Sequence, residues 1–204
     1  MSEAPAADNA ARPAKSSSSI VSQANARSSG IERRTTRTLH CPPDGSRVAF
    51  GSSNGLLVAN IEGSELHRIA SRPAGCPEWS PDGRNILYVS GQGSLSVVSA
   101  SGGPSIVLIS KEVGCGLGVG WGWSPNGKTA WVIGPAGTGR LTLIDLATRH
   151  KRTLPSFASV TGVAWSPDST QLLITARRNS SACSSLWEVD VNGSHRTRIV
   201  RCGN

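Results

Sequence analysis

The sequence predicts an all-β fold made of four copies of one repeat, preceded by a disordered tail. The first observation is a segment that recurs four times, with starts 38, 44 and 42 residues apart. The second is that short apolar runs are separated by Gly, Pro, Asp and Ser, as expected of strands and turns. The third is that no stretch shows the apolar period of a helix. The recurring segment reads CPPDGSRVAF at 41–50, WSPDGRNILYV at 79–89, WSPNGKTAWVI at 123–133 and WSPDSTQLLIT at 165–175.

The tail comprises residues 1–34, which are rich in Ser and Ala and contain no aromatic residue. Such a composition buries too little apolar surface to offset the entropy lost on ordering, so we expect disorder there. The repeats occupy residues 35–204. A repeat of about 42 residues has room for four short strands, which is the size of a β-propeller blade. We expect the blades at about 35–72, 73–112, 113–156 and 157–202.

Each expected blade has the same order of elements. A first strand leads into Trp-Ser-Pro, and Pro-Asp-Gly then makes a tight turn, because Pro presets its φ and Gly tolerates positive φ. The second strand alternates apolar residues, as at Ile86 and Tyr88, and links rich in Gly, Ser or Asn lead to a third and a fourth strand. The turn carries an acidic residue with an expected structural role, at Asp44, Asp82 and Asp168.

The Trp-Ser-Pro-Asp-Gly turn and its flanking strands resemble the WD-like propeller repeat of the TolB family over residues 35–202. The resemblance implies a non-enzymatic protein-interaction or ligand-binding scaffold. It leaves an alternative open, because similar repeats form the propeller portions of prolyl-oligopeptidase-like peptidases and the sensor regions of some bacterial kinases, whose catalytic domain would be absent here. Relatives usually close rings of six or more blades, so four repeats imply part of a ring, or self-association that completes one.

Two repeats depart from the family pattern. The first has Cys41-Pro42 where the others have Trp-Ser, and the fourth has Ser169 in place of Gly. The first repeat could therefore form an atypical end of the array, since terminal repeats often differ from internal ones.

Three tryptophans, Trp79, Trp123 and Trp165, occupy one position in successive repeats. Repetition at one position favours core side chains that fill the space between blades over an aromatic ligand cage, because each indole buries a large apolar area. Trp121 lies outside the repeat pattern, and the Gly-rich stretch 114–122 offers it little to pack against. We therefore expect Trp121 to be exposed and able to contact a ligand.

His40 and Glu78 each precede the repeat Trp position, on the first strands of adjacent blades. In a propeller the first strand lines the central channel, so this pair could do acid–base chemistry on a bound ligand. The alternative is two channel residues with no chemical role. Two apparent motifs are explained by turns: 122–129 matches a phosphate-binding loop but is followed by a strand, and 51–55 matches a nucleophile elbow but lies in a hairpin. We predict no catalytic residue, no metal and no cofactor.

The five cysteines include no CxxC pair, so a zinc site has no local support. Free thiols in a reducing compartment are the expectation. If the protein is exported, Cys183 and Cys202 on neighbouring strands are the first pair to test for a disulfide.

No apolar run exceeds four residues, so the sequence contains no membrane span. The first 30 residues lack a secretory signal, which predicts a cytoplasmic protein, or a periplasmic or extracellular one if the true start lies upstream. The expected fourth strands are basic, which opposes aggregation at sheet edges. They lack the interleaved aromatics of a nucleic-acid surface, so we expect a protein partner and no nucleic acid. The basic residues are Arg68, Arg72, Arg149, Lys151, Arg152, Arg196, Arg198 and Arg201.

Overall fold

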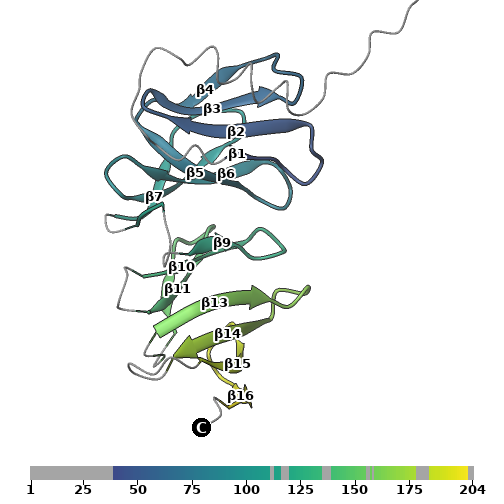
Figure 1. Ribbon diagram of the computed structural model, residues 1–204, viewed down its shortest axis with the longest axis vertical. Coiled ribbons are helices and arrows are strands. Elements are labelled where there is room, and N and C mark those ends of the chain that lie inside the picture. Colours follow the sequence, from purple (N-terminus) through teal and green to yellow (C-terminus); the bar gives the residue numbers. More distant parts are fainter. Residues whose placement is uncertain are drawn as a thin grey trace, which may run out of the picture.

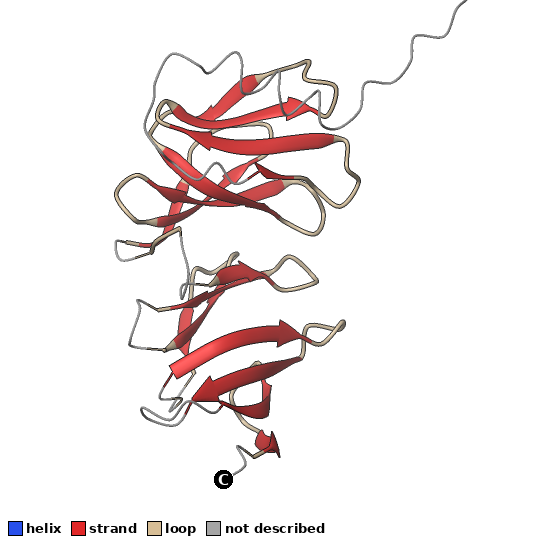
Figure 2. Ribbon diagram, viewed as in Figure 1, coloured by secondary structure: helices blue, strands red, loops and turns tan. Residues whose placement is uncertain are grey.

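The computed structural model describes residues 39–110, 113–115, 120–134, 139–154, 157, 159–177 and 184–201. These residues form four antiparallel sheets of four strands each, and they contain no helix (Figure 2). The all-β prediction is confirmed. The expected disordered tail, 1–34, lies outside the described residues.

Each sheet is one propeller blade. Blade 1 contains β1 (Leu39–His40), β2 (Arg47–Ser52), β3 (Gly55–Asn60) and β4 (His67–Ala70). Blade 2 contains β5 (Ala74–Trp79), β6 (Asn85–Ser90), β7 (Leu95–Ser99) and β8 (Ile106–Ile109). Blade 3 contains β9 (Trp121–Trp123), β10 (Thr129–Ile133), β11 (Leu141–Asp145) and β12 (Lys151–Thr153). Blade 4 contains β13 (Ser159–Trp165), β14 (Gln171–Arg177), β15 (Ser184–Asp190) and β16 (Arg196–Val200).

Within every blade the strands lie in chain order, so the first and fourth strands form the two edges of the sheet. The blades follow one another along the long axis of the molecule, with blade 1 at the top of Figure 1 and blade 4 at the bottom. Blades 1 and 4 lie at opposite ends, so the described blades form an open series and not a closed four-bladed ring. This arrangement is a partial β-propeller.

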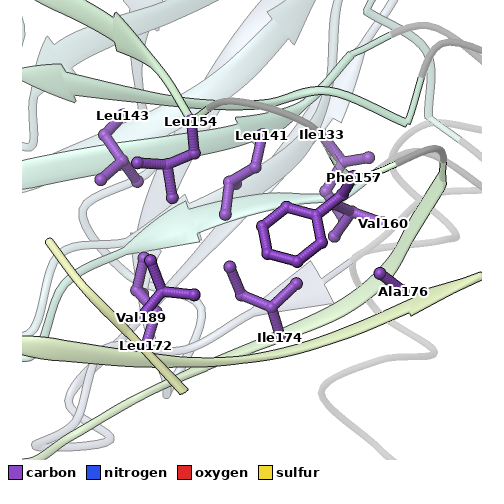
Figure 3. Packing of buried hydrophobic residues seen from close by; sticks show 10 residues of the cluster. All are labelled: Ile133, Leu141, Leu143, Leu154, Phe157, Val160, Leu172, Ile174, Ala176 and Val189. Carbon is purple, nitrogen blue, oxygen red and sulfur yellow. The ribbon is translucent and has the colours of Figure 1, made fainter. Parts of the chain in front are cut away.

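Three hydrophobic cores join successive blades, one at each junction. They form because the second strand of an inner blade is buried on both faces: in β6, Ile86 and Tyr88 face blade 1, whereas Leu87 and Val89 face blade 3. Figure 3 shows the core between blades 3 and 4. Its buried members are Ile133, Leu141, Leu143, Leu154, Phe157, Val160, Leu172, Ile174, Ala176 and Val189.

In blades 2, 3 and 4 a serine organises the turn between the first and second strands. In blade 2 the Ser80 hydroxyl donates to the Asp82 carboxylate (2.6 Å) and accepts a hydrogen bond from the Asn85 N–H (2.9 Å). The Ser80 bond is the main reason that the pKa of Asp82 is lowered, so this carboxylate is ionised and serves the turn. The same pair of bonds recurs through Ser124, Asn126 and Thr129 in blade 3 and through Ser166, Asp168 and Gln171 in blade 4.

The two atypical repeats keep this turn with local changes. In blade 1 Pro42 replaces the serine, and Asp44 instead accepts hydrogen bonds from the amide (3.0 Å) and hydroxyl (2.8 Å) of Ser46. In blade 4 Ser169 has a φ of 63°, close to the 66° of Gly83 at the equivalent position of blade 2. A side chain is disfavoured at this φ, so Ser169 is locally strained. Its hydroxyl accepts a hydrogen bond from the Asn126 N–H of blade 3 (3.1 Å).

The cysteine interpretation needs correction. Cys76 and Cys115 form a disulfide, with their Cα atoms 6.0 Å apart, so these two are not free thiols. Cys76 lies in a β-bulge of β5 with a φ of 49°, and this conformation turns its side chain away from the regular ladder. Sequence spacing could not show this, because the pairing depends on the bulge and on the approach to blade 3. Cys41 is exposed and free, whereas Cys183 and Cys202 lie outside the described residues.

Candidate functional site

The first candidate site lies on the first strands of blades 1 to 3, where the sequence analysis placed His40 and Glu78. His40 makes two hydrogen bonds across the junction between blades 1 and 2. Its Nδ1 accepts the backbone N–H of Trp79 (3.3 Å), and its carbonyl accepts the indole Nε1–H of the same residue (2.9 Å). Burial lowers the pKa of His40, which agrees with a neutral ring whose Nδ1 is an acceptor.

Glu78 plays the same role one junction further along. Its carbonyl accepts the indole Nε1–H of Trp123 (3.1 Å), and its carboxyl is hydrogen-bonded by the backbone amide of Trp123. We call this arrangement the tryptophan clasp. The Trp that ends the first strand of one blade donates two hydrogen bonds, one from its backbone N–H and one from its indole N–H, to a single residue of the previous blade. That residue lies one place before the repeat Trp position of its own blade. Trp79 is 4% exposed and Trp123 is 8% exposed, so both indoles are core side chains.

The third junction lacks both hydrogen bonds of the clasp. The residue that should receive Trp165 is Gly122, which has no side chain to accept a hydrogen bond. The Trp165 indole is half-buried, and its Nε1 is buried without a protein hydrogen-bond partner. Gly122 is glycine for a steric reason: a Cβ there would lie 2.9 Å from the Trp131 Nε1 and 3.0 Å from the Glu78 Oε1. Those two polar groups therefore share the space beside β9.

Glu78 is the most perturbed titratable group in this region. Burial raises its pKa to about 7 from an ordinary value of 4.5, and the hydrogen bond from Trp123 opposes the change. A buried carboxyl that holds its proton near neutral pH has the property required of a general acid or base. In this structure the carboxyl has a structural role instead, because it accepts the hydrogen bond from the Trp123 backbone amide at the junction between blades 2 and 3.

Glu78→Gln is expected to make the protein more stable at pH 8 by about 1–2 kcal/mol. The folded protein holds the Glu78 proton more tightly than the unfolded chain, so the stability from this group is complete below pH 4.5 and is lost as the pH rises to 7. A change from 4.5 to 7 corresponds to about 3 kcal/mol. We expect roughly half of that, because the carboxyl keeps some solvent access. Gln removes the charge and can still accept the Trp123 amide.

Urea unfolding at pH 4, 6 and 8 measures this effect. The exposed residue Glu62 supplies the control, and Glu62→Gln should leave the pH dependence of the wild type unchanged. Equal slopes of stability against pH for the wild type and Glu78→Gln would show that burial does not raise the pKa of Glu78.

A pocket of about 450 Å³ lies at the opposite end of the same first strands. It is formed where β2 and β6 end and β5 begins, and the segment 113–115 borders it. Among the described residues, the lining consists of glycine backbone and neutral side chains, and none of them is ionisable except the disulfide-bonded Cys115. Its size is within the range of small-ligand sites. The sequence does not predict this pocket directly, although the glycines that line it indicate points of close backbone approach.

Trp121 is less exposed than the sequence analysis expected. It is half-buried on β9 and packs against the core between blades 2 and 3. The reason is that the neighbouring blade packs against the Trp121 side chain, a contact that the Gly-rich sequence around this residue does not indicate. Of the proposed binding residues, His40 and Glu78 lie at successive junctions and Trp121 lies on the next first strand.

The segment 122–129 contains no phosphate-binding loop. It consists of the end of β9, a turn and the start of β10, and Lys128 is exposed in the turn. Among the residues that the structure describes, no group of three or more His, Cys, Asp or Glu side chains could hold a metal ion. The described part of the chain also lacks any helix that is long and apolar enough to cross a membrane.

Comparison with solved structures agrees with the fold. TolB from Agrobacterium tumefaciens matches with a TM-score of 0.57 and 21% identity, over 81% of this chain and 61% of that one. TolB from Acinetobacter baumannii matches with a TM-score of 0.57 and 16% identity, over 80% of this chain and 43% of that one. A prolyl endopeptidase matches with a TM-score of 0.63 and 16% identity, over 86% of this chain and 30% of that one.

These likenesses define the class of the protein as a β-propeller with the TolB-like fold. The chain spans about three fifths or less of the length of these three structures. No protein-family model and no curated protein matches the sequence.

Proposed function

We propose that the chain is a non-enzymatic scaffold of the TolB-like propeller type, which holds a protein partner at the mouth of its channel strands. One observation carries the proposal. The side chains of His40 and Glu78, on the first strands, are engaged in clasps between blades, while the described lining of the pocket at the opposite end of these strands is neutral. Such a pocket can bind an uncharged, extended segment, and its described lining residues offer no general acid or base.

The Cys76–Cys115 disulfide borders this pocket and supports a location in an oxidising compartment. This is the periplasmic or extracellular alternative. We also propose that a second copy of this chain completes the ring. The outward face of blade 4 supports this, because its apolar residue Leu173 is 42% exposed and could pack against another blade.

The pocket can be filled without strain at Gly114. A Cβ at this position would meet no atom within 4 Å, and Gly114 is exposed at the pocket wall. Gly114→Trp should occupy the space, whereas Gly114→Ala should leave most of it open. A photo-crosslinking residue in place of the exposed Ser53, which also lines the pocket, would capture a bound partner in cells.

We expect a protein adduct with the wild type and with Gly114→Ala, and its loss with Gly114→Trp. The purified chain should show no hydrolysis of peptide or ester substrates above that of Glu78→Gln. An adduct that persists in Gly114→Trp would contradict a pocket-bound partner. Hydrolysis that depends on Glu78 would contradict the non-enzymatic role.

The propeller portion of a prolyl-oligopeptidase-like peptidase is the second candidate. The match to a prolyl endopeptidase favours it, since 86% of this chain aligns with only 30% of that enzyme. A hydrolase domain encoded in the same reading frame would support this candidate over the independent scaffold.

A further inference from the structure

Charge is distributed unevenly between the two halves of the described chain. The described residues of blades 1 and 2 contain four Arg and five Asp or Glu, whereas those of blades 3 and 4 contain nine Lys or Arg and four Asp or Glu. The acidic residues of blades 3 and 4 are mostly engaged in turns: Asp145 accepts hydrogen bonds from Thr148, and Asp190 accepts one from Ser194. These turns therefore orient the Asp145 and Asp190 carboxylates.

The excess positive charge gathers on the fourth strands of blades 3 and 4 and on the residues that flank them. We call this surface the basic edge, and it consists of Arg149, Lys151, Arg152, Arg196, Arg198 and Arg201. All of these residues are exposed except Arg198, which is half-buried. The two blades are continuous here, because the Arg152 guanidinium donates to the Val191 carbonyl of blade 4 (3.3 Å).

Aromatic rings hold two of these guanidinium groups in place. The Arg196 guanidinium lies 4.1 Å from the ring centroid of Phe157 and 4.1 Å from that of Trp187. Arg198 lies 5.4 Å from the Trp187 centroid. Stacking of this kind orients the planar fork of arginine, which suits the recognition of carboxylates. The arginines cover these rings, so the rings are not a free platform for stacked bases.

The strand that bears Arg196 and Arg198 lies at an edge of its sheet. β16 is the outermost strand of blade 4, and among the described strands it pairs with β15 alone. Ile199 and Val200 at its end are each 50% exposed. Arg196 and Arg198 are two residues apart, so they project from the same face of the sheet. An added strand with acidic residues at alternate positions would place them opposite these arginines.

We propose that the basic edge binds an acidic, extended segment of a protein partner, which adds to β16 as a fifth strand of blade 4. Backbone hydrogen bonds would supply affinity and the arginines would supply specificity. Charge on the edge opposes pairing with a second copy of this chain, which is equally basic there, and favours an acidic strand. The inference rests on the proposed role as a protein-binding scaffold, but it uses a surface far along the chain from the Gly114 pocket.

The test is fluorescence anisotropy of a labelled peptide in which Glu alternates with Val, titrated with the full chain. The double variant Lys151→Glu, Arg201→Glu reverses two exposed charges and should weaken binding at least tenfold. The matched control, Arg72→Glu with Arg84→Glu, reverses two exposed charges on blades 1 and 2 and should leave the affinity within twofold. The same peptide with alternate N-methylated amides keeps its charge but cannot pair, so its binding should also fall at least tenfold.

Three results would overturn the proposal. Equal loss in the control variant would show that any reduced net charge matters, and equal binding of the N-methylated peptide would exclude strand addition. Tighter binding of a single-stranded DNA of the same charge would assign the basic edge to nucleic acid. Gly114→Trp separates the two sites, because it should bind the peptide normally while it loses the adduct captured through Ser53. Failure of one site therefore does not imply failure of the other.

Discussion

Replacing Trp79 with Ala is expected to lower the free energy of unfolding by about 4 kcal/mol. The indole is 4% exposed and fills the core between blades 1 and 2, and truncation of such a side chain costs about 3–5 kcal/mol. Two further contacts are lost with it: the Nε1–H bond to the His40 carbonyl and the Arg47 guanidinium, 4.6 Å from the ring centroid. Chemical denaturation monitored by far-ultraviolet circular dichroism measures the change.

Trp165→Ala is the matched comparison for this prediction. The Trp165 indole is half-buried and its Nε1 has no protein partner, so we expect a loss of about 2 kcal/mol, below the roughly 3–5 kcal/mol of a fully buried tryptophan. Trp79→Phe keeps much of the packing and removes the indole donor, so its effect should lie between those of the wild type and Trp79→Ala. Equal losses for Trp79→Ala and Trp165→Ala would contradict the prediction that the hydrogen-bonded Trp79 stabilises its junction more than Trp165 does.

Removal of the Cys76–Cys115 disulfide is expected to cost a similar amount, about 4 kcal/mol. The two residues are 39 apart in sequence, and the chain-entropy model assigns about this value to a loop of that length. The double variant Cys76→Ala, Cys115→Ala keeps a Cβ at the positive φ of Cys76, so the local backbone strain is the same in both proteins. The comparison therefore isolates the cross-link.

Urea unfolding with and without a reductant checks this prediction. The reductant should lower the stability of the wild type to that of the double variant and should not affect the variant itself. Cys41→Ala, at an exposed free thiol, should be indistinguishable from the wild type. A wild type that does not respond to reductant while it is unfolded would show that the cross-link does not form.

The blade pattern could be predicted from sequence because its signals are local. Each turn between the first and second strands is held by bonds within a few residues, as between Ser80 and Asp82, so the repeat is visible without knowledge of neighbouring blades. The alternation at Ile86 and Leu87 likewise reports two buried faces.

Features that depend on contacts between blades were not predicted. The pairing of Cys76 with Cys115 depends on a bulge and on the position of the next blade. The stacking of Arg196 depends on Phe157 and Trp187, which come from other parts of the chain. The clasp did have a sequence signal, because His40 and Glu78 were singled out at the correct repeat position. Their role as hydrogen-bond acceptors for a tryptophan depends on contacts between neighbouring blades, which the sequence does not encode locally.

The uneven charge of the two halves also affects how the protein meets a partner. Blades 1 and 4 lie at opposite ends of the long axis, so the separated charge gives the described part of the chain a dipole along that axis (Figure 1). An anionic surface exerts a torque on such a dipole and turns the blade 4 end towards itself before contact. At physiological ionic strength this influence extends about 8 Å, so it acts in the last stage of approach. Salt should therefore slow the rate of association with an acidic partner more than it speeds dissociation.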